Sequence, residues 1–210
     1  MHEIAEYLKI IVGLLAILNP IGAIPVFISL TTNESPMQRQ HTVNLSAFGV
    51  LCVLLVSLFF GEALLRFFGI SIDSFRVGGG ILVLLMAISM LQAKTSLIKQ
   101  TDEEVSESLA KESVAIVPLA MPLLAGPGAI SAVILAAHKS DGLIDYAAVA
   151  IGIVILSAIV WLTLRIAPWL AARISATGIN IFTRIMGLIL AAIAIEYIAN
   201  GLKGLFPALS

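Results

Sequence analysis

The amino-acid sequence predicts an all-α protein with six membrane-spanning helices. Its 210 residues are 60% hydrophobic and 12% charged, and the mean hydropathy is +1.07. A soluble domain carries about 25% charged residues, so this chain has too few to cover the surface of a water-soluble globule. The apolar residues form continuous stretches of about 20 residues, the length that a helix needs to cross a bilayer. A transmembrane β-barrel would instead show alternating segments of about ten residues.

The expected spans are residues 6–31, 42–65, 73–93, 113–137, 143–167 and 179–203. Together they form one transmembrane domain, residues 1–210, in which the acidic loop 94–112 separates two halves of three spans, about 1–93 and 113–210. An even number of spans places both termini on one side of the membrane. Lys and Arg are slightly more numerous on the other side, so the positive-inside rule predicts that both termini lie outside.

The two halves resemble each other in the positions of their helix-breaking residues. Pro122 follows Pro20, and Pro127 follows Pro25, by the same 102 residues. Because each half has an odd number of spans, the second half must enter the membrane inverted relative to the first. Inverted repeats of this kind are typical of secondary transporters.

The first and fourth spans are expected to break near the middle of the membrane. Proline removes a backbone donor and clashes with the preceding turn, so Pro20 and Pro25, with Gly22 between them, should unwind residues 19–25. The sequence Gly126-Pro127-Gly128 should do the same in the fourth span. Structural proline kinks are the alternative interpretation.

Two such breaks would form a polar site inside the bilayer. Half-helix N-termini offer N–H groups to a carboxylate, and C-terminal ends offer carbonyls to an ammonium group. This pairing suits a zwitterion such as an amino acid. Pro25 and Pro127 fit the first position of the restarting half-helices. The expected substrate-binding residues are Asn19, Pro20, Gly22, Ala23, Pro25, Pro122, Ala125, Gly126, Pro127 and Gly128.

Charged residues inside the spans are the remaining candidates for function. Glu196 lies within the last span, where a carboxylate is costly; it is a candidate for ion coupling or for binding a substrate ammonium group. The alternative is an acid near the membrane boundary that reaches water or pairs with a basic residue such as Lys203. Arg76 and Arg184 occupy matching positions of the repeat, and we expect them to anchor their helices by reaching toward the membrane interface.

Other patterns have simpler interpretations. Gly78, Gly79 and Gly80 open the third span and should allow close packing against the broken helices. Glu62 and Arg66 are four residues apart and suit an exposed ion pair.

Several classes of function find no support in the sequence. A single cysteine, Cys52, and three isolated histidines offer no metal-ligand spacing. The chain has no Walker motif and no G-x-S-x-G motif, and its net charge of −1 gives no basic field for nucleic acid. We therefore expect no enzyme activity, no cofactor and no metal. A coupling proton or sodium ion, the lipid bilayer and a second copy of the chain remain as partners.

Two long motifs resemble the signatures of a known family. NPIGAIPVFISLT in the first span, IVPLAMPLLAGPGAIS in the fourth and the ending RIMGLILAAIAIEYIANGL are similar to segments of the MarC family of bacterial and archaeal inner-membrane proteins. That family includes transporters of small neutral amino acids such as glycine and alanine. The resemblance therefore implies a multi-pass inner-membrane transporter or exporter whose substrate binds at the breaks. The alternatives are a non-transporting membrane protein, either an intramembrane enzyme or a scaffold, and a passive channel for small solutes.

Overall fold

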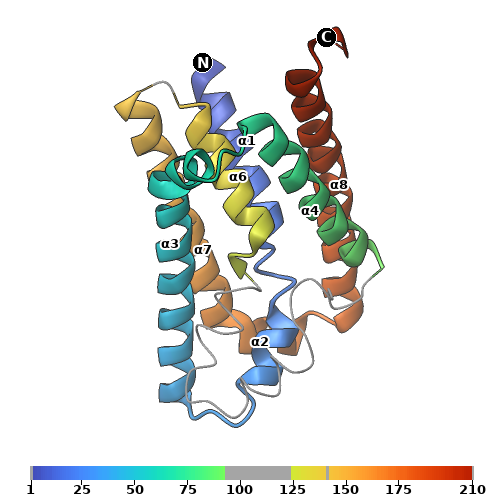
Figure 1. Cartoon of the computed structure of the whole chain (residues 1–210). Coiled ribbons are helices and arrows are strands. Elements are labelled where there is room, and N and C mark those ends of the chain that lie inside the picture. Colours follow the sequence, from blue (N-terminus) through green and yellow to red (C-terminus); the bar gives the residue numbers. More distant parts are fainter. Residues whose placement is uncertain (1, 93–123, 141, 210) are drawn as a thin grey trace.

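The structure is a computed structural model that describes residues 2–92, 124–140 and 142–209 (Figure 1). Every regular element in these ranges is helical, as the sequence predicts. The elements are α1 (His2–Leu18), α2 (Ile24–Leu30), α3 (Pro36–Phe67), α4 (Ile72–Leu91), α6 (Pro127–His138), α7 (Leu143–Arg173), α8 (Ala176–Leu205) and the short 3-10 helix η2 (Pro207–Leu209). The N- and C-termini lie at the same end of the molecule, the upper end in Figure 1.

Among the described residues, four helices are long and apolar enough to cross a membrane: α3, α4, α7 and residues 177–205 of α8. Residues 7–18 of α1 and all of α6 are shorter apolar helices. The arrangement is that of a polytopic membrane protein, whereas the six spans and the inverted repeat stay predictions. The loop 94–112 and residues 113–123 of the expected fourth span lie outside the described residues.

Three helices are longer than the expected spans, namely α3, α7 and α8, and the extension is greatest for α3 and α7. The second span was expected from residue 42, but α3 begins at Pro36, because Ser35 and Gln38 form a capping box that satisfies the first backbone N–H groups. The fifth was expected to end at residue 167, but α7 continues through Pro168 to Arg173. Counting charge-free residues misses such polar extensions, because a helix can continue beyond the hydrocarbon core.

Helix α6 lies at the centre of the fold and contacts α1, α3 and α4. Nine of its twelve residues are buried, namely 128, 129 and 131–137. Their side chains are mostly small, which allows the surrounding helices to approach closely. The outer faces of α3, α7 and α8 carry large exposed apolar side chains, including Phe48, Phe59, Phe60, Ile151, Leu162, Ile181 and Leu188. Such a surface suits lipid.

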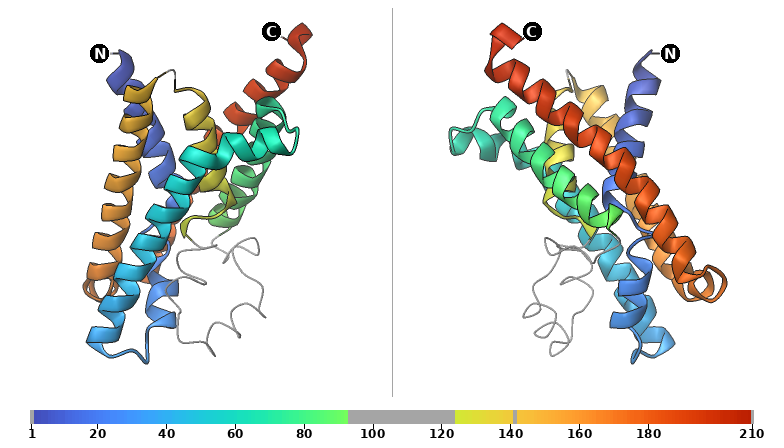
Figure 2. Two further views of the ribbon diagram at one scale, coloured as in Figure 1. Left: turned by 60° about the vertical axis from the view of Figure 1, so that its left-hand side comes forward. Right: turned by 90° about the vertical axis from the view of Figure 1, so that its right-hand side faces the viewer.

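Helices α4 and α8 form the most extensive helix pair of the described chain and run side by side (Figure 2, right). Glycines bring their backbones together. A Cβ atom added to Gly80 would lie 2.8 Å from Ile198 Cγ1 and 3.0 Å from the Ala194 carbonyl oxygen. One added to Gly79 would lie 2.8 Å from Ser131 Cβ of α6, whereas one added to Gly78 would meet nothing within 4 Å. The predicted close packing against a broken span is confirmed for Gly79, which contacts α6, whereas Gly80 packs against α8 instead.

These neighbouring glycines offer a matched pair of variants. We expect Gly80→Ala to destabilise the protein by about 1–3 kcal/mol, because the added methyl group overpacks the α4–α8 contact. Gly78→Ala should be neutral or stabilise by up to about 1 kcal/mol through helix propensity alone. Thermal unfolding in detergent measures both. Equal unfolding midpoints for the two variants would contradict the described α4–α8 contact.

Candidate functional site

The first span is broken where the sequence predicts it. Helix α1 ends at Leu18, α2 begins at Ile24, and residues 19–23 form turns. Asn19 has a φ of 41°, a left-handed conformation that asparagine tolerates better than most residues. Because Pro20 has no N–H group, the Ala16 carbonyl loses its donor four residues ahead. The backbone is therefore non-helical at this point.

The side chain of Asn19 closes the break. Its Oδ1 accepts a hydrogen bond from the Gly22 backbone N–H at 3.2 Å, and the residue is only 5% exposed. A Cβ atom on Gly22 would lie 2.1 Å from Asn19 Nδ2, so glycine is required for this arrangement. Pro20 and Ala23 are also buried. Asn19, Gly22 and their neighbours thus form one compact polar turn inside the apolar core.

The start of α6 lies beside this turn. Gly126 is the N-cap, has extended backbone and supplies no side-chain cap, and Pro127 occupies the first helical position as predicted. Ala125 and Gly126 are buried. A Cβ atom on Gly128 would lie 3.6 Å from Ile17 Cγ2 in the last turn of α1, so the structure brings the two regions together. The remaining predicted residue of this region, Pro122, lies outside the described residues.

Three predicted site residues have other surroundings than expected. Pro25 and Pro127 are exposed, and Pro25 is the second residue of α2 rather than the first. A Cβ atom on Gly128 would lie 2.9 Å from Met86 Sδ, so this glycine provides helix packing. The buried polar part of the region therefore consists of the Asn19 turn and the Gly126 N-cap.

A large cavity lies between α1, α4, α6 and α8, toward the end that carries the termini. Its volume is about 970 Å³. On α1 its lining extends from Leu8 to Leu14, and on α6 from Lys139 back to Ala132. Leu14 and Ala132 lie about one helical turn from the Asn19 turn and from the start of α6, respectively. The polar residues of the lining are Lys9, Arg76, Lys139, Glu196, Tyr197 and Asn200.

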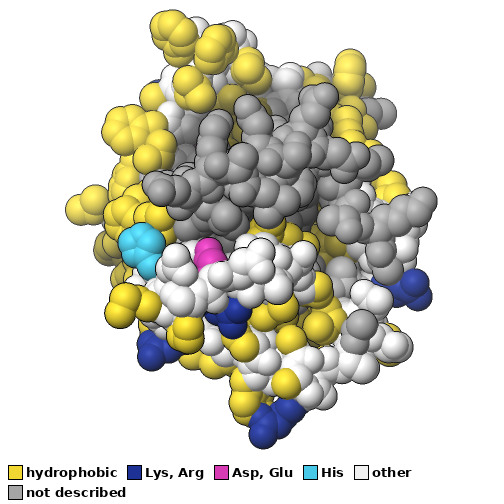
Figure 3. Space-filling model, turned by 90° about the horizontal axis from the view of Figure 1, so that it is seen from below, with side chains coloured by type: hydrophobic (Ala, Val, Ile, Leu, Met, Phe, Trp, Pro, Cys, Tyr) yellow, Lys and Arg dark blue, Asp and Glu magenta, His cyan; other side chains and the backbone are white. Residues whose placement is uncertain are grey.

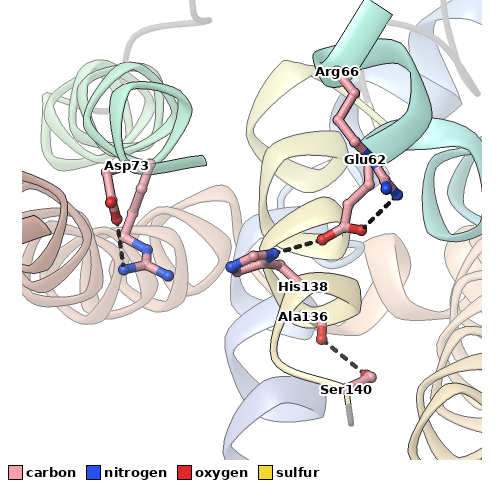
Figure 4. A network of polar contacts seen from close by, with 7 residues as sticks. Glu62, Arg66, Asp73, Ala136, His138 and Ser140 are labelled. Atoms are coloured by element: carbon pink, nitrogen blue, oxygen red, sulfur yellow. Dashed lines mark hydrogen bonds and ion pairs between the residues drawn. The ribbon is translucent and has the colours of Figure 1, made fainter. Parts of the chain in front are cut away.

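Arg76 is partly enclosed at the start of α4. Its side chain is 18% exposed, lines the cavity and pairs with Asp73 through Nη1 and Oδ1 at 3.4 Å; Figure 4 shows this contact at Asp73. The repeat-related Arg184 is exposed, as an anchoring residue should be. Arg76 is more enclosed than Arg184 because α8 packs against the start of α4, and an interfacial role for both arginines stays a prediction.

Glu196 also lines the cavity, on α8. Its residue is exposed, and it makes no ion pair within 4.0 Å among the residues that the structure describes. The alternative of a pair with Lys203 therefore does not apply. A carboxylate that faces an open cavity remains available for a cation.

A second polar cluster connects α3 with the end of α6 (Figure 4). The predicted pair of Glu62 and Arg66 is confirmed at 3.3 Å, and both residues are near the surface. Glu62 also contacts His138 Nδ1 at 2.6 Å, although the two residues are 76 positions apart. Sequence spacing gives no signal for such a contact. Within the described ranges, no group of acidic, histidine or cysteine residues could hold a metal ion.

The opposite end of the molecule carries arginines beside tryptophans. Arg165 lies over the Trp161 ring at 4.8 Å and Arg173 over the Trp169 ring at 4.1 Å, all on α7. Figure 3 shows this end from below, with several Lys and Arg side chains in the lower half of the view. Such pairs are typical of a membrane interface. The prediction that the termini lie outside also counts lysines in residues 94–112, which the structure does not describe, and it stays a prediction.

Comparisons with known proteins cover the whole chain. The model described as MarC family integral membrane protein matches residues 4–206. The UPF0056 membrane protein YhcE of Escherichia coli is 45% identical over 97% of this chain and 94% of its own length. The UPF0056 membrane protein YvbG of Bacillus subtilis is 35% identical over 96% of both chains, and one from Methanocaldococcus jannaschii is 40% identical over 91% of this chain and 93% of its own. No solved structure matches.

The contact between Asn19 and Gly22 can be tested with a double-mutant cycle. We expect Gly22→Ala to destabilise the protein by about 1–3 kcal/mol, because the methyl group displaces the Asn19 amide and breaks its hydrogen bond. Asn19→Gly keeps the left-handed backbone but removes the amide, so Gly22→Ala should cost much less in that background. Unfolding midpoints in detergent are measured for the wild type, the two single variants and the double variant. Additive effects would disprove the contact.

Proposed function

The chain belongs to the MarC family of integral membrane proteins, and on this premise we propose that it is a secondary transporter or exporter of small neutral amino acids. The substrates are of the glycine and alanine class. Transport proceeds by alternating access in the inner (cytoplasmic) membrane, and the substrate binds at the breaks of the first and fourth spans. Membership of the family establishes an integral membrane protein, and we infer the transported solute.

The observation that carries the proposal is the buried polar turn at Asn19 beside the start of α6. Non-helical backbone survives at membrane depth only inside protein or along an aqueous cavity. Here the Ala16 carbonyl has lost its helical donor, and the first turn of α6 has no side-chain cap. Carbonyl groups from one break and N–H groups from the other suit the two charges of an amino acid.

The proposed architecture is six spans in two inverted repeats. Two features are in keeping with it: both termini lie at one end, and a proline is in the first or second position of the helix that follows each break, Pro25 in α2 and Pro127 in α6. Helices α4 and α8, which are the third and sixth spans of the proposed repeat, pack directly on each other. In other secondary transporters a similar relation of two halves underlies alternating access.

The cavity fits one state of such a cycle. It lies toward the end that carries the termini and its lining stops about one turn from the breaks, at Leu14 and Ala132. Movement of the surrounding helices would connect it with the substrate site. Energy comes from an ion gradient or from the substrate gradient, and Glu196 in the cavity is the candidate for coupling to a proton or to sodium.

Counterflow in proteoliposomes tests the function directly. Vesicles are loaded with unlabelled glycine or alanine, and labelled substrate is added outside under different pH and sodium gradients. A carrier gives saturable accumulation that other small neutral amino acids inhibit. A passive channel gives no counterflow, and a scaffold or an enzyme gives no flux. Absence of exchange with every amino acid, from folded protein, would refute the proposal.

The place of the site can be tested at two glycines that cap helices. Gly126 caps α6 and is buried, whereas Gly142 caps α7, is exposed, and has no atom within 4 Å of an added Cβ. We expect Gly126→Leu to reduce counterflow to the level of protein-free vesicles, because a bulky side chain blocks access to the backbone. Gly142→Leu should retain wild-type counterflow. Wild-type apparent affinity in a folded Gly126→Leu protein would move the substrate site elsewhere.

A further inference from the structure

The charged cavity combines both signs of charge on four helices. Lys9 comes from α1, Arg76 from α4, Lys139 from the end of α6, and Glu196 from α8. When Asp73 is counted as the partner of Arg76, one positive charge remains in excess. Lys9, Lys139 and Glu196 are exposed and Arg76 is partly enclosed, so a ligand with charges of its own can reach all four residues from one cavity.

We propose that this cavity is a capture site for amino-acid zwitterions, in which Arg76 binds the carboxylate and Glu196 binds the ammonium group. The inference rests on the proposed function and adds to it a second, more accessible site ahead of the breaks. The binding residues differ from those at the breaks, so the two sites can be tested separately.

Arg76 is suited to a carboxylate because it is held in place but not saturated. Its guanidinium makes one contact with Asp73, at 3.4 Å, and no other hydrogen bond among the described residues. That distance is long for a charge-assisted bond, which is usually about 2.7–2.9 Å. The planar guanidinium has five N–H donors and can bind a carboxylate in bidentate fashion. Its side chain is 18% exposed and lines the cavity.

Glu196 and Arg76 line one cavity from two helices that pack on each other, α8 and α4. A Cβ atom on Gly201 would lie 2.8 Å from the Asp73 carbonyl oxygen, and one on Gly80 would lie 2.8 Å from Ile198 Cγ1. The turns that carry Glu196 and Arg76 are therefore in backbone contact. Both side chains line the same cavity. An anion site and a cation site are thus held at one crossing.

The rest of the cavity fits the role of capture rather than occlusion. Its volume of about 970 Å³ is far larger than glycine or alanine and leaves room for water. Lys9 and Lys139 are exposed at two other helices of its wall. Their positive charge attracts the carboxylate of an approaching substrate, and the specific contacts then come from Arg76 and Glu196.

Protection of a cavity cysteine from labelling tests binding without requiring transport. Asn200→Cys places a thiol in the lining, in a Cys52→Ala background, and Lys203→Cys places a control thiol on the same helix outside it. A water-soluble maleimide labels both. Glycine should slow labelling of the cavity thiol only. Glycinamide lacks the carboxylate and acetate lacks the ammonium group. Each should reach half protection only at a concentration about tenfold or more above that of glycine.

Single charge removals then assign the two partners. In Arg76→Gln the half-protecting concentration of glycine should rise about tenfold or more, to that of glycinamide, while glycinamide itself is unaffected. In Glu196→Gln, the half-protecting concentration of glycine should rise to that of acetate. Arg184→Gln, at the matching position of the proposed repeat, should leave all values unchanged. A purely structural effect of Arg76 would weaken every ligand equally. If Arg76→Gln does not fold, Arg76→Lys replaces it, because lysine keeps the positive charge beside Asp73. In Arg76→Lys the half-protecting concentration of glycine should rise less than in Arg76→Gln.

The outcomes separate this inference from the proposed transport. No protection by glycine in a protein that performs counterflow would overturn the capture site and leave transport standing. Protection without counterflow would support the capture site and refute transport. Unchanged selectivity in Arg76→Gln, or an equal loss for all three ligands, would remove Arg76 as the carboxylate partner.

Discussion

The need to satisfy every backbone polar group at membrane depth governs this structure. Helices meet that need within themselves, so the described chain is almost entirely helical. The exceptions are instructive. Where α1 stops at Leu18, the Asn19 amide takes over the bond that a helix would have supplied to Gly22. The turn is buried beside α6 rather than exposed to lipid, and the large apolar side chains of α3, α7 and α8 form the outer surface.

Small residues are the second condition for this arrangement. An uninterrupted set of large side chains would keep α4 and α8 apart, but Gly80, Gly187 and Gly201 place the backbone of one helix against the other. Small side chains also allow close packing around α6, in which alanine is the most frequent residue. Close approach of α4 and α8 explains why Arg76 is enclosed and why Glu196 faces the same cavity. The glycines therefore determine how closely α4 and α8 pack, and this packing determines where the Arg76 and Glu196 side chains lie.

Local signals in the sequence were enough to predict the broken first span. Prolines and glycines determine backbone conformation directly, so the interruption after Leu18 and the helix start at Pro127 could be predicted from their positions. Helix ends beyond the apolar stretches, such as the start at Pro36, depend on capping side chains and were missed. The cavity could not be predicted at all. Its lining joins Lys9 and Lys139 to residues of α4 and α8, and only the tertiary arrangement brings them together.

The glycine contacts between α4 and α8 have a mechanical consequence. Each helix fills hollows of the other at several levels along its length, from Gly187 beside Ala87 to Gly201 beside Asp73. Sliding or separating the two helices would open voids at each of these contacts, so we expect α4 and α8 to move together as one rigid unit. α1 and α6, which form other walls of the cavity, belong to the rest of the bundle and have fewer contacts with this unit. A swing of the unit would change the width of the cavity while the two charged residues at its crossing, Arg76 and Glu196, keep their spacing.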